Sequence, residues 1–468
     1  MLFDVTAILN SGALGGVAEA FVAHEMNQLV SHVSAADPSV QDPSGISSLI
    51  GPYLTPEQET GSATILSSAV DPSMLPKLGG TALLNELALF PSSQISSYLI
   101  HHPFQVNQML SDPPSARSVA SMWSMLSVSS QKALAKSAPQ LVGNLDGVPF
   151  DMRDAANRRF LRQSIATLEA SIESGAGRAT LVEDRHHLDI LKQVQRTLKR
   201  SAGDPPRQLL TFDPRGEARA AVVVGNLETA DYVSYLVPGM FFTVQGQMYD
   251  WTVIAQDLYK EQTSWIKLLA KSDTTMVGKT SATVSWIGYT TPGALDIGSL
   301  DRANEGARLL GNAVQGIQTV REGSEPYVTL VTHSYGSTAA MIELAKGGVT
   351  VDALAIVGSP GSATQSAARL SVRNDNVYVG EAAWDPVVNT AFYGSDPGSP
   401  SFGAKKMSVA GGVDVITRKD LAPAIGHLGY FDADTEAMRN LALIGIDEGP
   451  LVTNGTLADA SRTIASAR

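Results

Sequence analysis

The chain has 468 residues and a formal net charge of -12 at neutral pH. This acidic balance argues against nucleic acid and against an anionic membrane surface as main partners, because both attract basic proteins. Apolar residues make up 44% of the chain, which is enough for a sizeable core and excludes disorder on composition. The chain contains no cysteine, which excludes disulfides, cysteine-ligated zinc and a cysteine nucleophile.

The first residues, MLFDVTAIL, carry no basic residue ahead of their apolar stretch and therefore make a poor signal peptide. No stretch approaches the roughly 18 uninterrupted apolar residues of a membrane-spanning helix, so no transmembrane segment is expected. We expect a cytoplasmic protein, and export without a cleavable signal stays open as an alternative.

Residues 1–140 show short helical patterns interrupted by proline, glycine and serine. The segment 16–33 places an apolar stripe along one helix face, and 115–139 predicts two short helices, the second capped by a serine near position 129. Strand alternation is scarce here. The prediction is a helical N-terminal region over residues 1–140.

Two longer helical patterns follow, over 149–174 and 178–203, and SGAG (174–177) separates them. The Lys/Arg-rich end of the second pattern and Gly203 suit a helix C-terminus. We expect an antiparallel helical hairpin over residues 141–206 that packs on the following domain.

After DPPR (204–207) the hydrophobic period changes from helical to strand-like. Apolar runs alternate with helical patterns such as 249–270 and 300–320. This alternation predicts an α/β domain over 207–450, with a mainly parallel sheet and helices on both faces, followed by a tail over 451–468. The predicted strands are QLLTF (208–212), ARAAVVVGN (218–226), VSYLVPG (233–239), TVSWIGY (283–289), YVTLVT (327–332), ALAIVGS (353–359) and NVYVGEA (376–382).

The stretch YVTLVTHSYGSTAA (327–340) ends a strand pattern at Ser334 and begins a helix pattern directly after it. A nucleophile elbow requires this strand–turn–helix context, with small residues two before and two after the nucleophile. Gly336 meets the second requirement, whereas Thr332 stands where glycine is usual. We predict that Ser334 is a nucleophile; the alternative is an ordinary hydroxyl at a strand-to-helix corner.

A serine nucleophile needs a base, and His333 and His427 are the only histidines after residue 200. His333 adjoins the serine on the turn and is poorly placed to accept its proton. His427 lies in the glycine-flanked loop AIGHLGYF (424–431), where the chain order nucleophile, acid, histidine puts the last member of a triad. The alternative for His427 is a histidine in a surface loop.

The acid is expected after a strand that lies between these two positions, and Asp385 directly follows the run 376–382. A carboxylate there would accept the Nδ1–H of the histidine and fix its tautomer. Asp385 could also merely cap the turn that follows it. Three competitors are Glu381 at the strand end, Asp396 in a Pro/Gly loop, and Asp414, whose simplest interpretation is a solvated strand face.

An oxyanion hole needs two N–H donors, and one is the backbone of the residue after the nucleophile, Tyr335. The loop after the strand 233–239 supplies the second candidate. Met240 is the predicted donor, and Gly239 would allow a close approach to the reacting group. The alternative is a plain tight turn.

At these residues the chain resembles the α/β-hydrolase superfamily and, more narrowly, an actinobacterial α/β-hydrolase family of unknown function. The likeness covers about 143–440, and it implies Ser334, Asp385 and His427 as a triad without implying a substrate. That family usually shows G-H-S-Y-G at the elbow, so Thr332 is a departure. The resemblance rests on GNLDGVPFDMRDAANRRFL (143–161), VSYLVPGM (233–240), THSYGST (332–338), IVGSPGS (356–362), AWDPV (383–387), SDPGSPSFGA (395–404) and GHLGYF (426–431).

The leading hypothesis is a serine hydrolase that cleaves a carboxylic ester, with lipid and acyl esters among the candidates, and that needs no metal or organic cofactor. His333, Trp384 and Asp396 are candidate pocket residues. The N-terminal helices are expected to limit access to the pocket or to bind a protein partner. Alternatives are a thioesterase, amidase or peptidase with the same triad, and a non-catalytic scaffold that binds a partner protein. The oligomeric state stays open.

Overall fold

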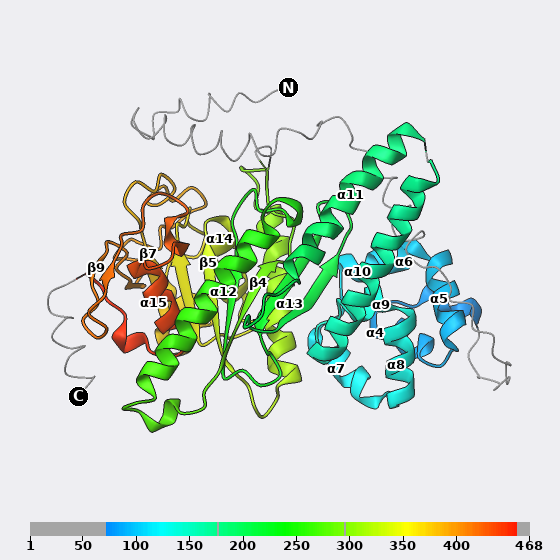
Figure 1. Cartoon of the computed structure of the whole chain (residues 1–468), viewed down its shortest axis with the longest axis horizontal. Helices are drawn as coiled ribbons and strands as arrows, with labels where there is room; N and C mark the ends of the chain where they lie inside the picture. The colour runs from blue at the N-terminus through cyan, green and yellow to red at the C-terminus, as the bar shows by residue number, and fades with distance from the viewer. Residues whose placement is uncertain (1–71, 176, 294–295, 456–468) are drawn as a thin grey trace.

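The computed structural model describes residues 72–175, 177–293 and 296–455 (Figure 1). The helix predicted over 16–33 and most of the predicted C-terminal tail lie outside these residues. Figure 1 shows a group of helices beside a region built on a sheet. Across the described ranges, no helix combines the length and the apolar character needed to cross a membrane.

The first described helices pack around their own apolar core, which includes Leu83, Leu99 and Leu134. Ser127 caps the second of the two helices predicted over 115–139, two residues before the expected position, by accepting a hydrogen bond from the N–H of Ser130. These helices are η2 (Pro72–Lys77), α4 (Gly80–Leu87), α5 (Ser92–His101), α6 (Pro103–Ser111), α7 (Ala116–Met125), α8 (Val128–Ser137) and α9 (Pro139–Val142).

The two long helices α10 (Phe150–Glu173) and α11 (Arg178–Thr197) contact each other and lie between this group and the sheet (Figure 1). Helix α10 packs against the first strand, where the rings of Phe160 and Phe212 are 5.7 Å apart. Helix α11 packs against α12 (Val244–Leu269). The described helices of the N-terminal region therefore contact the sheet domain on the side of its first strand.

Within the described residues, eight strands form one sheet in the order β1-β2-β4-β3-β5-β6-β7-β8. The pairs β1–β2 and β2–β4 are antiparallel and the other pairs are parallel, which confirms the predicted mainly parallel sheet. The strands are β1 (Arg207–Asp213), β2 (Arg219–Gly225), β3 (Tyr232–Val237), β4 (Ser281–Ile287), β5 (Tyr327–His333), β6 (Ala353–Val357), β7 (Val377–Gly380) and β8 (Lys405–Lys406).

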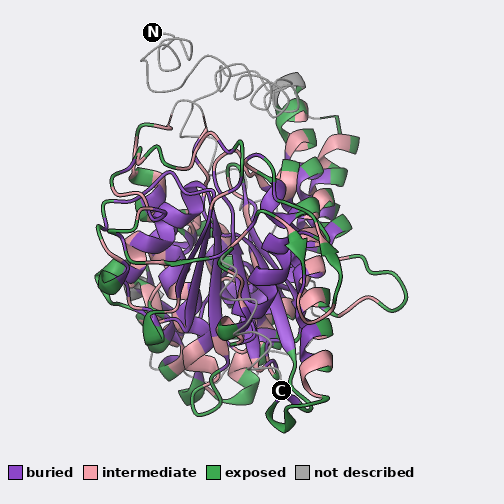
Figure 2. Ribbon diagram, turned by 90° about the vertical axis from the view of Figure 1, so that its left-hand side faces the viewer, coloured by how far each residue is buried: buried purple, intermediate pink, exposed green. Residues whose placement is uncertain are grey.

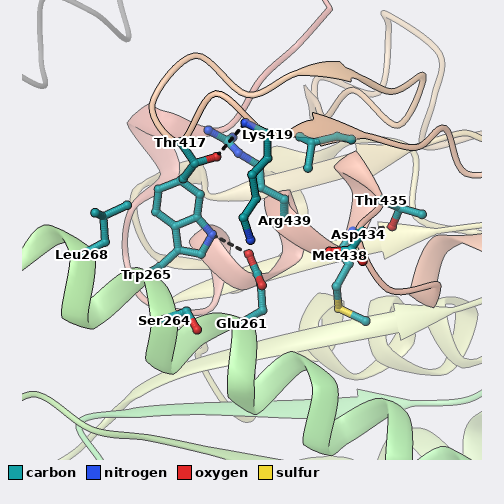
Figure 3. A pocket seen from close by; sticks show the side chains of 11 residues that line it. Glu261, Ser264, Trp265, Leu268, Thr417, Lys419, Asp434, Thr435, Met438 and Arg439 are labelled. Atoms are coloured by element: carbon teal, nitrogen blue, oxygen red, sulfur yellow. Dashed lines mark hydrogen bonds between the residues drawn. The ribbon is translucent and has the colours of Figure 1, made fainter.

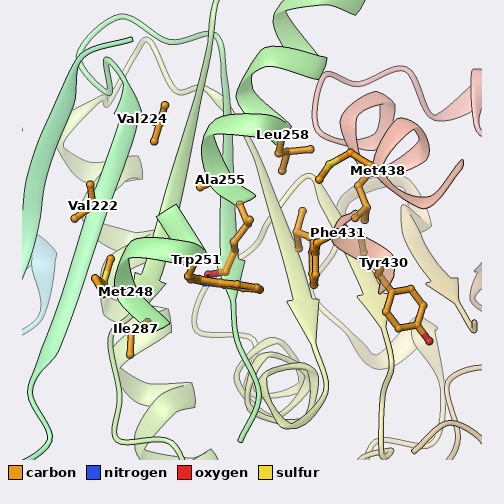
Figure 4. Close-up of a cluster of buried hydrophobic side chains, with 14 of the residues drawn as sticks. Val222, Val224, Met248, Trp251, Ala255, Leu258, Ile287, Tyr430, Phe431 and Met438 are labelled. Atoms are coloured by element: carbon orange, nitrogen blue, oxygen red, sulfur yellow. The ribbon is translucent and has the colours of Figure 1, made fainter. Parts of the chain in front are cut away.

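Helices cover both faces of this sheet, as predicted, and the strands between them are buried (Figure 2). Helices α13 (Asp301–Val320) and α14 (Tyr335–Lys346) pack on one face. On the other face, α12 and α15 (Glu436–Ile444) enclose an apolar cluster in which Trp251 lies against Phe431, with ring centroids 5.1 Å apart (Figure 4). Strands buried on both faces read as continuous apolar runs, which is why they could be recognised in the sequence.

The remaining elements are short, and three of them lie between β8 and α15. Because parallel strands end at a common edge, the loops after β3, β5 and β7 are brought together there. These elements are β9 (Gly412–Val413) and β10 (Asp420–Leu421), which pair with each other, and the 3-10 helices η3 (Thr274–Met276), η4 (Ala367–Arg369), η5 (Arg373–Asp375), η6 (Gly429–Phe431) and η7 (Gly449–Leu451).

Candidate active site

Ser334 occupies a strained turn between β5 and α14, with φ 53° and ψ -133°. Residues other than glycine rarely adopt this backbone conformation, but the nucleophile of a nucleophile elbow does. The N–H of Ser334 donates to the carbonyl of Val357 (3.0 Å), and its carbonyl accepts from Ser337 Oγ (2.6 Å). Hydrogen bonds on both sides therefore hold the strained residue in place, as a pre-organised reactive group requires.

Two glycines allow the loop after β3 to pack closely against this turn. A Cβ atom on Gly239 would lie 2.4 Å from Ser334 Cβ and 3.2 Å from the backbone nitrogen of Tyr335. A Cβ atom on Gly336 would lie 2.4 Å from the carbonyl oxygen of Pro238. The predicted oxyanion donors, the amides of Met240 and Tyr335, therefore flank a place where two backbone segments meet beside the candidate nucleophile.

Thr332, the departure from the usual elbow pattern, is fully buried within β5. It lies opposite Ile356 of β6, and its hydroxyl donates to the carbonyl of Ala355 (3.0 Å). The hydroxyl thus has a partner inside the sheet and the β-branched side chain suits a strand. The turn at Ser334 is formed with threonine at this position.

Asp385 and His427 are brought together, with Asp385 Oδ1 2.9 Å from His427 Nδ1. Burial alone would raise the pKa of Asp385, but the hydrogen bonds from His427, Tyr430 and the N–H of Val387 outweigh it and lower that pKa. The carboxylate is therefore ionised and can only accept, so Nδ1 of the imidazole is the donor. Nε2 is left as an acceptor, which is the tautomer that a general base needs.

Tyr430 is a member of this site that sequence reasoning missed. Its hydroxyl donates to Asp385 Oδ2 (2.7 Å) and accepts from the N–H of Ala382 (2.8 Å). The loop of His427 is also joined to the acid loop by a hydrogen bond from the N–H of Gly426 to the carbonyl of Ala383 (2.9 Å). The signal that could have found Tyr430 is a hydroxyl-bearing aromatic residue three positions after the predicted base.

His333, a candidate pocket residue, is 1% exposed. Its Nε2 lies 2.7 Å from the carbonyl oxygen of His427, and the two imidazole centroids are 4.5 Å apart. Burial, followed by the neighbouring His427 ring, lowers the pKa of His333 to about 3. The imidazole is therefore neutral at physiological pH and packs against the candidate base.

The other two candidate pocket residues differ in their surroundings. Trp384, immediately before the candidate acid, is 76% exposed and has a positive φ of 62°. Asp396 is half-buried, and its Oδ1 accepts from the N–H of Gly398 (2.9 Å), so that the carboxylate stabilises its own turn. The competing acid Glu381 faces the same loop, because a Cβ on Gly398 would overlap its carboxylate.

Asp414, the third competitor, is 3% exposed, so its interpretation as a solvated residue is wrong. It forms a buried ion pair with Arg439, 2.7 Å between Oδ2 and Nε. A separate cavity of about 110 Å³ lies beside this pair, between α12, the β9–β10 hairpin and α15 (Figure 3). None of the candidate site residues is among the described residues that line this cavity.

The described part of the chain offers no evident metal site. It contains no cluster of three or more histidine, aspartate or glutamate side chains that could hold a metal ion. The chemistry that the described arrangement can support is transfer of a proton between a hydroxyl and an imidazole that a buried carboxylate orients.

Comparison with known proteins supports the fold. Residues 213–395 match the sequence model of a family described as alpha/beta hydrolase. An uncharacterized protein of Mycobacterium tuberculosis is 26% identical over 406 residues, which cover 76% of this chain and 60% of that protein. An uncharacterized protein of Mycobacterium bovis is 26% identical over 251 residues, which cover 51% of this chain and 87% of that protein. The chain thus spans about 60% of the length of the first relative.

Among solved structures, a carboxyl esterase from Tuber melanosporum aligns with a TM-score of 0.32 and 13% identity over 55% of this chain and 89% of that one. A thermostable esterase from Pseudomonas putida aligns with a TM-score of 0.32 and 12% identity over 62% of this chain and 96% of that one. The family match over residues 213–395 and the mainly parallel sheet described above agree with an alpha/beta-hydrolase fold in this part of the chain.

Proposed function

We propose that the protein is a serine hydrolase that cleaves a carboxylic ester through a covalent acyl-enzyme. Ser334 is the nucleophile, His427 is the general base, and Asp385 orients it. The amides of Met240 and Tyr335 hold the oxyanion. The observation that carries the proposal is the Asp385–His427 pair, 2.9 Å apart. The carbonyl oxygen of His427 is also bonded to His333, the residue directly before the strained turn at Ser334.

In the first half of the reaction, Ser334 Oγ forms a bond to the ester carbonyl carbon while its proton passes to His427 Nε2. The negative charge that develops on the carbonyl oxygen is stabilised by the two backbone N–H groups. The bond to the alcohol oxygen then breaks and the alcohol takes the proton from His427. In the second half, water attacks the acyl-enzyme, with His427 again accepting and returning the proton. Asp385 stabilises the imidazolium form in both halves.

Between the two described residues Ser334 and His427, no hydrogen bond joins Oγ to the imidazole. Catalytic hydrogen bonds in enzymes without substrate are often long and tighten only when substrate binds, so this geometry is compatible with the proposed roles. The exposed fraction of the His427 side chain is 20%, and that of the Asp385 side chain is zero. The partly exposed His427 can therefore contact a substrate, whereas the buried Asp385 cannot. This difference supports His427 as the base and Asp385 as the residue that orients it.

Exposed apolar side chains support an apolar group on the substrate. Trp384 adjoins Asp385, while Ile425 and Leu428 flank His427; they are 76%, 58% and 41% exposed. The Trp384 and Ile425 segments are neighbours, because Ala383 and Ile425 form a β-bridge. We name these three side chains the apolar rim. Large apolar groups left in water beside a reactive site favour binding of an acyl chain or another apolar ester group.

The test is labelling with a fluorophosphonate, which forms a bond to an activated serine and releases fluoride. We expect the wild-type protein to be labelled and the Ser334→Ala variant to be inert, with both proteins showing the same thermal unfolding. Absence of labelling at Ser334 in folded wild-type protein would overturn the proposal and favour a non-catalytic scaffold.

The leaving group is tested separately, because a thioesterase, an amidase and an esterase use the same three side chains. p-Nitrophenyl esters of increasing acyl length, with a matched thioester and anilide, measure this preference. We expect kcat/KM to be highest for esters and to rise with acyl length over the first few methylenes, by about threefold to fourfold per buried CH2. A flat response to acyl length would contradict an apolar substrate, and faster thioester or anilide cleavage would identify the other classes.

A further inference from the structure

His333 is bonded to the candidate base in a way that the proposed chemistry does not use. Its Nε2 lies 2.7 Å from the carbonyl oxygen of His427. A carbonyl oxygen can only accept, so the proton of the neutral His333 imidazole is on Nε2. Among the described contacts, no other group donates to this carbonyl. The backbone of the candidate base is therefore anchored here by one side chain.

The mostly aromatic surroundings of His333 would suit an apolar side chain better than a histidine. Its ring lies among aromatic rings, with centroids 5.7 Å from Phe431, 6.3 Å from Tyr430 and 6.4 Å from Phe242. Its Nδ1 is buried and has no hydrogen-bond partner, which is unfavourable for a polar atom. A phenylalanine would fill a similar volume without burying an unpaired acceptor. The gain that offsets this cost is the bond to the carbonyl of His427.

We infer that His333 is a positioning residue that fixes His427 relative to Ser334, an inference that rests on the function proposed above. Because His333 and Ser334 are consecutive, the end of β5 carries both the nucleophile and the donor that holds the backbone of the base. Asp385 holds the ring of that base through its Nδ1. Two anchors, one on the backbone and one on the imidazole, thus determine where Nε2 of His427 meets Oγ of Ser334.

Three substitutions separate this role from simple packing. His333→Phe keeps a ring and removes both the donor and the unpaired Nδ1. His333→Gln places an amide N–H near the position of the missing Nε2. His333→Asn carries the same amide on a side chain one methylene shorter, which does not reach the carbonyl, and it serves as the matched control for the glutamine.

We expect His333→Phe to slow both kcat and fluorophosphonate labelling by about 10- to 100-fold, since misplacing a catalytic group by about 1 Å has effects of this size. KM should change by less than about twofold, because His333 is 1% exposed and so offers a substrate almost no surface. His333→Gln should regain most of the rate and His333→Asn should not. Equal rates for the glutamine and asparagine variants, at equal unfolding temperatures, would overturn the inference.

A second measurement needs no activity and separates this inference from the proposed function. In the Ser334→Ala background, NMR of ¹⁵N-labelled histidine reports the Nδ1–H proton that His427 shares with Asp385. We expect this signal to broaden and exchange faster with solvent in His333→Phe and to recover in His333→Gln. If wild-type protein is not labelled by fluorophosphonate but this pattern holds, the positioning role stands and the esterase proposal fails. An unchanged His427 signal together with wild-type labelling in His333→Phe would overturn the positioning role alone.

Discussion

At the scale of single residues, Asp385 and Asp414 are two buried carboxylates with different partners, one a histidine and the other an arginine. Asp385→Asn removes the acceptor for Nδ1–H and favours the wrong tautomer of His427, so kcat should fall by about 10⁴-fold. Asp414→Asn leaves Arg439 without its counter-charge and should reduce the free energy of unfolding by about 3–5 kcal/mol.

Labelling rates and urea unfolding of both variants check this pair of expectations. Folded Asp414→Asn protein should keep the wild-type labelling rate, which makes it the matched control for loss of a buried charge. An equal loss of labelling in both variants would mean that Asp385 acts only through the fold.

Thr332 offers a second prediction at this scale, because its hydroxyl is bonded within the sheet and does not contact the turn. Thr332→Val should lower the free energy of unfolding by about 1 kcal/mol through loss of the hydrogen bond to Ala355. Thr332→Gly should lower it by more, since it also removes a buried side chain. Both variants should label at the wild-type rate. A labelling rate at least tenfold higher in Thr332→Gly would show that threonine restrains the elbow.

At the scale of elements, the loop after β3 and the turn before α14 are packed too closely to accept a side chain. Gly239→Ala would bring a methyl group within 2.4 Å of Ser334 Cβ, so one segment must move away from the other. We expect the labelling rate to fall by about 100-fold or more, comparable to loss of one oxyanion donor. Gly79→Ala, at the start of α4 where a Cβ would meet nothing within 4 Å, is the control and should label normally. Normal labelling of Gly239→Ala would contradict the proposed oxyanion loop.

A charge cluster at the end of β1 makes stability depend on pH. Asp213 is paired with Arg219 (2.6 Å) and Arg215 (2.7 Å), and Arg219 also donates to the carbonyl of Leu110 in α6. Burial alone would raise the pKa of Asp213, but the two arginines, Arg219 first, lower it to about 2 from a usual 3.8.

Because the folded pKa of Asp213 is lower than the unfolded one, its contribution is complete above pH 3.8 and is lost as the pH falls from 3.8 toward 2. The loss should be about 2 kcal/mol of unfolding free energy. Urea unfolding between pH 2 and 5 measures it, and Asp213→Asn should remove this part of the pH dependence. If the unfolding free energy of Asp213→Asn falls as steeply with decreasing pH as that of the wild type, other carboxyl groups cause the pH dependence.

At the scale of the whole molecule, buried polar contacts join the helical region to the sheet domain. Arg153 in α10 pairs with Asp146 (2.6 Å), and Asn312 of α13 donates to the same carboxylate. Asn157 donates to the carbonyl of Leu209 in β1. An unpaired polar group is costly inside a protein, so losing these contacts from one part destabilises the other, and both parts should unfold together.

Calorimetry tests this coupling. We expect one thermal transition for the wild-type protein, and Arg153→Met should shift that whole transition down, with a loss of about 3–5 kcal/mol for breaking a buried pair. A separate, earlier transition in either protein would show that the helical region unfolds independently.

The sheet was largely predictable from the sequence because its strands are buried on both faces and read as apolar runs. β8 and β10 were missed, since two-residue, mostly exposed segments such as Lys405–Lys406 have no hydrophobic pattern, whereas β9 lies in the strand-like run around Asp414. The antiparallel pairing of β1 with β2 could not be predicted either, because the hydrophobic periodicity of a strand carries no information about the direction of its neighbour.

Within the candidate site, the chain order and the strand–turn–helix pattern pointed to Ser334, Asp385 and His427, and the structure places Asp385 beside His427. The supporting contacts could not be read in the same way. Tyr430 and His333 act across distances of 45 and 94 residues along the chain, and only the folded arrangement of the loops brings them to their partners.

Trp384 gives the protein a built-in optical reporter. The chain has five tryptophans, and the structure buries the other four, Trp123, Trp251, Trp265 and Trp286, while Trp384 stands in solvent beside the candidate acid. A collisional quencher such as acrylamide should therefore reach mainly Trp384. Protection of its emission on addition of an uncleavable ester analogue would report occupancy of the apolar rim directly, in unlabelled protein and without turnover.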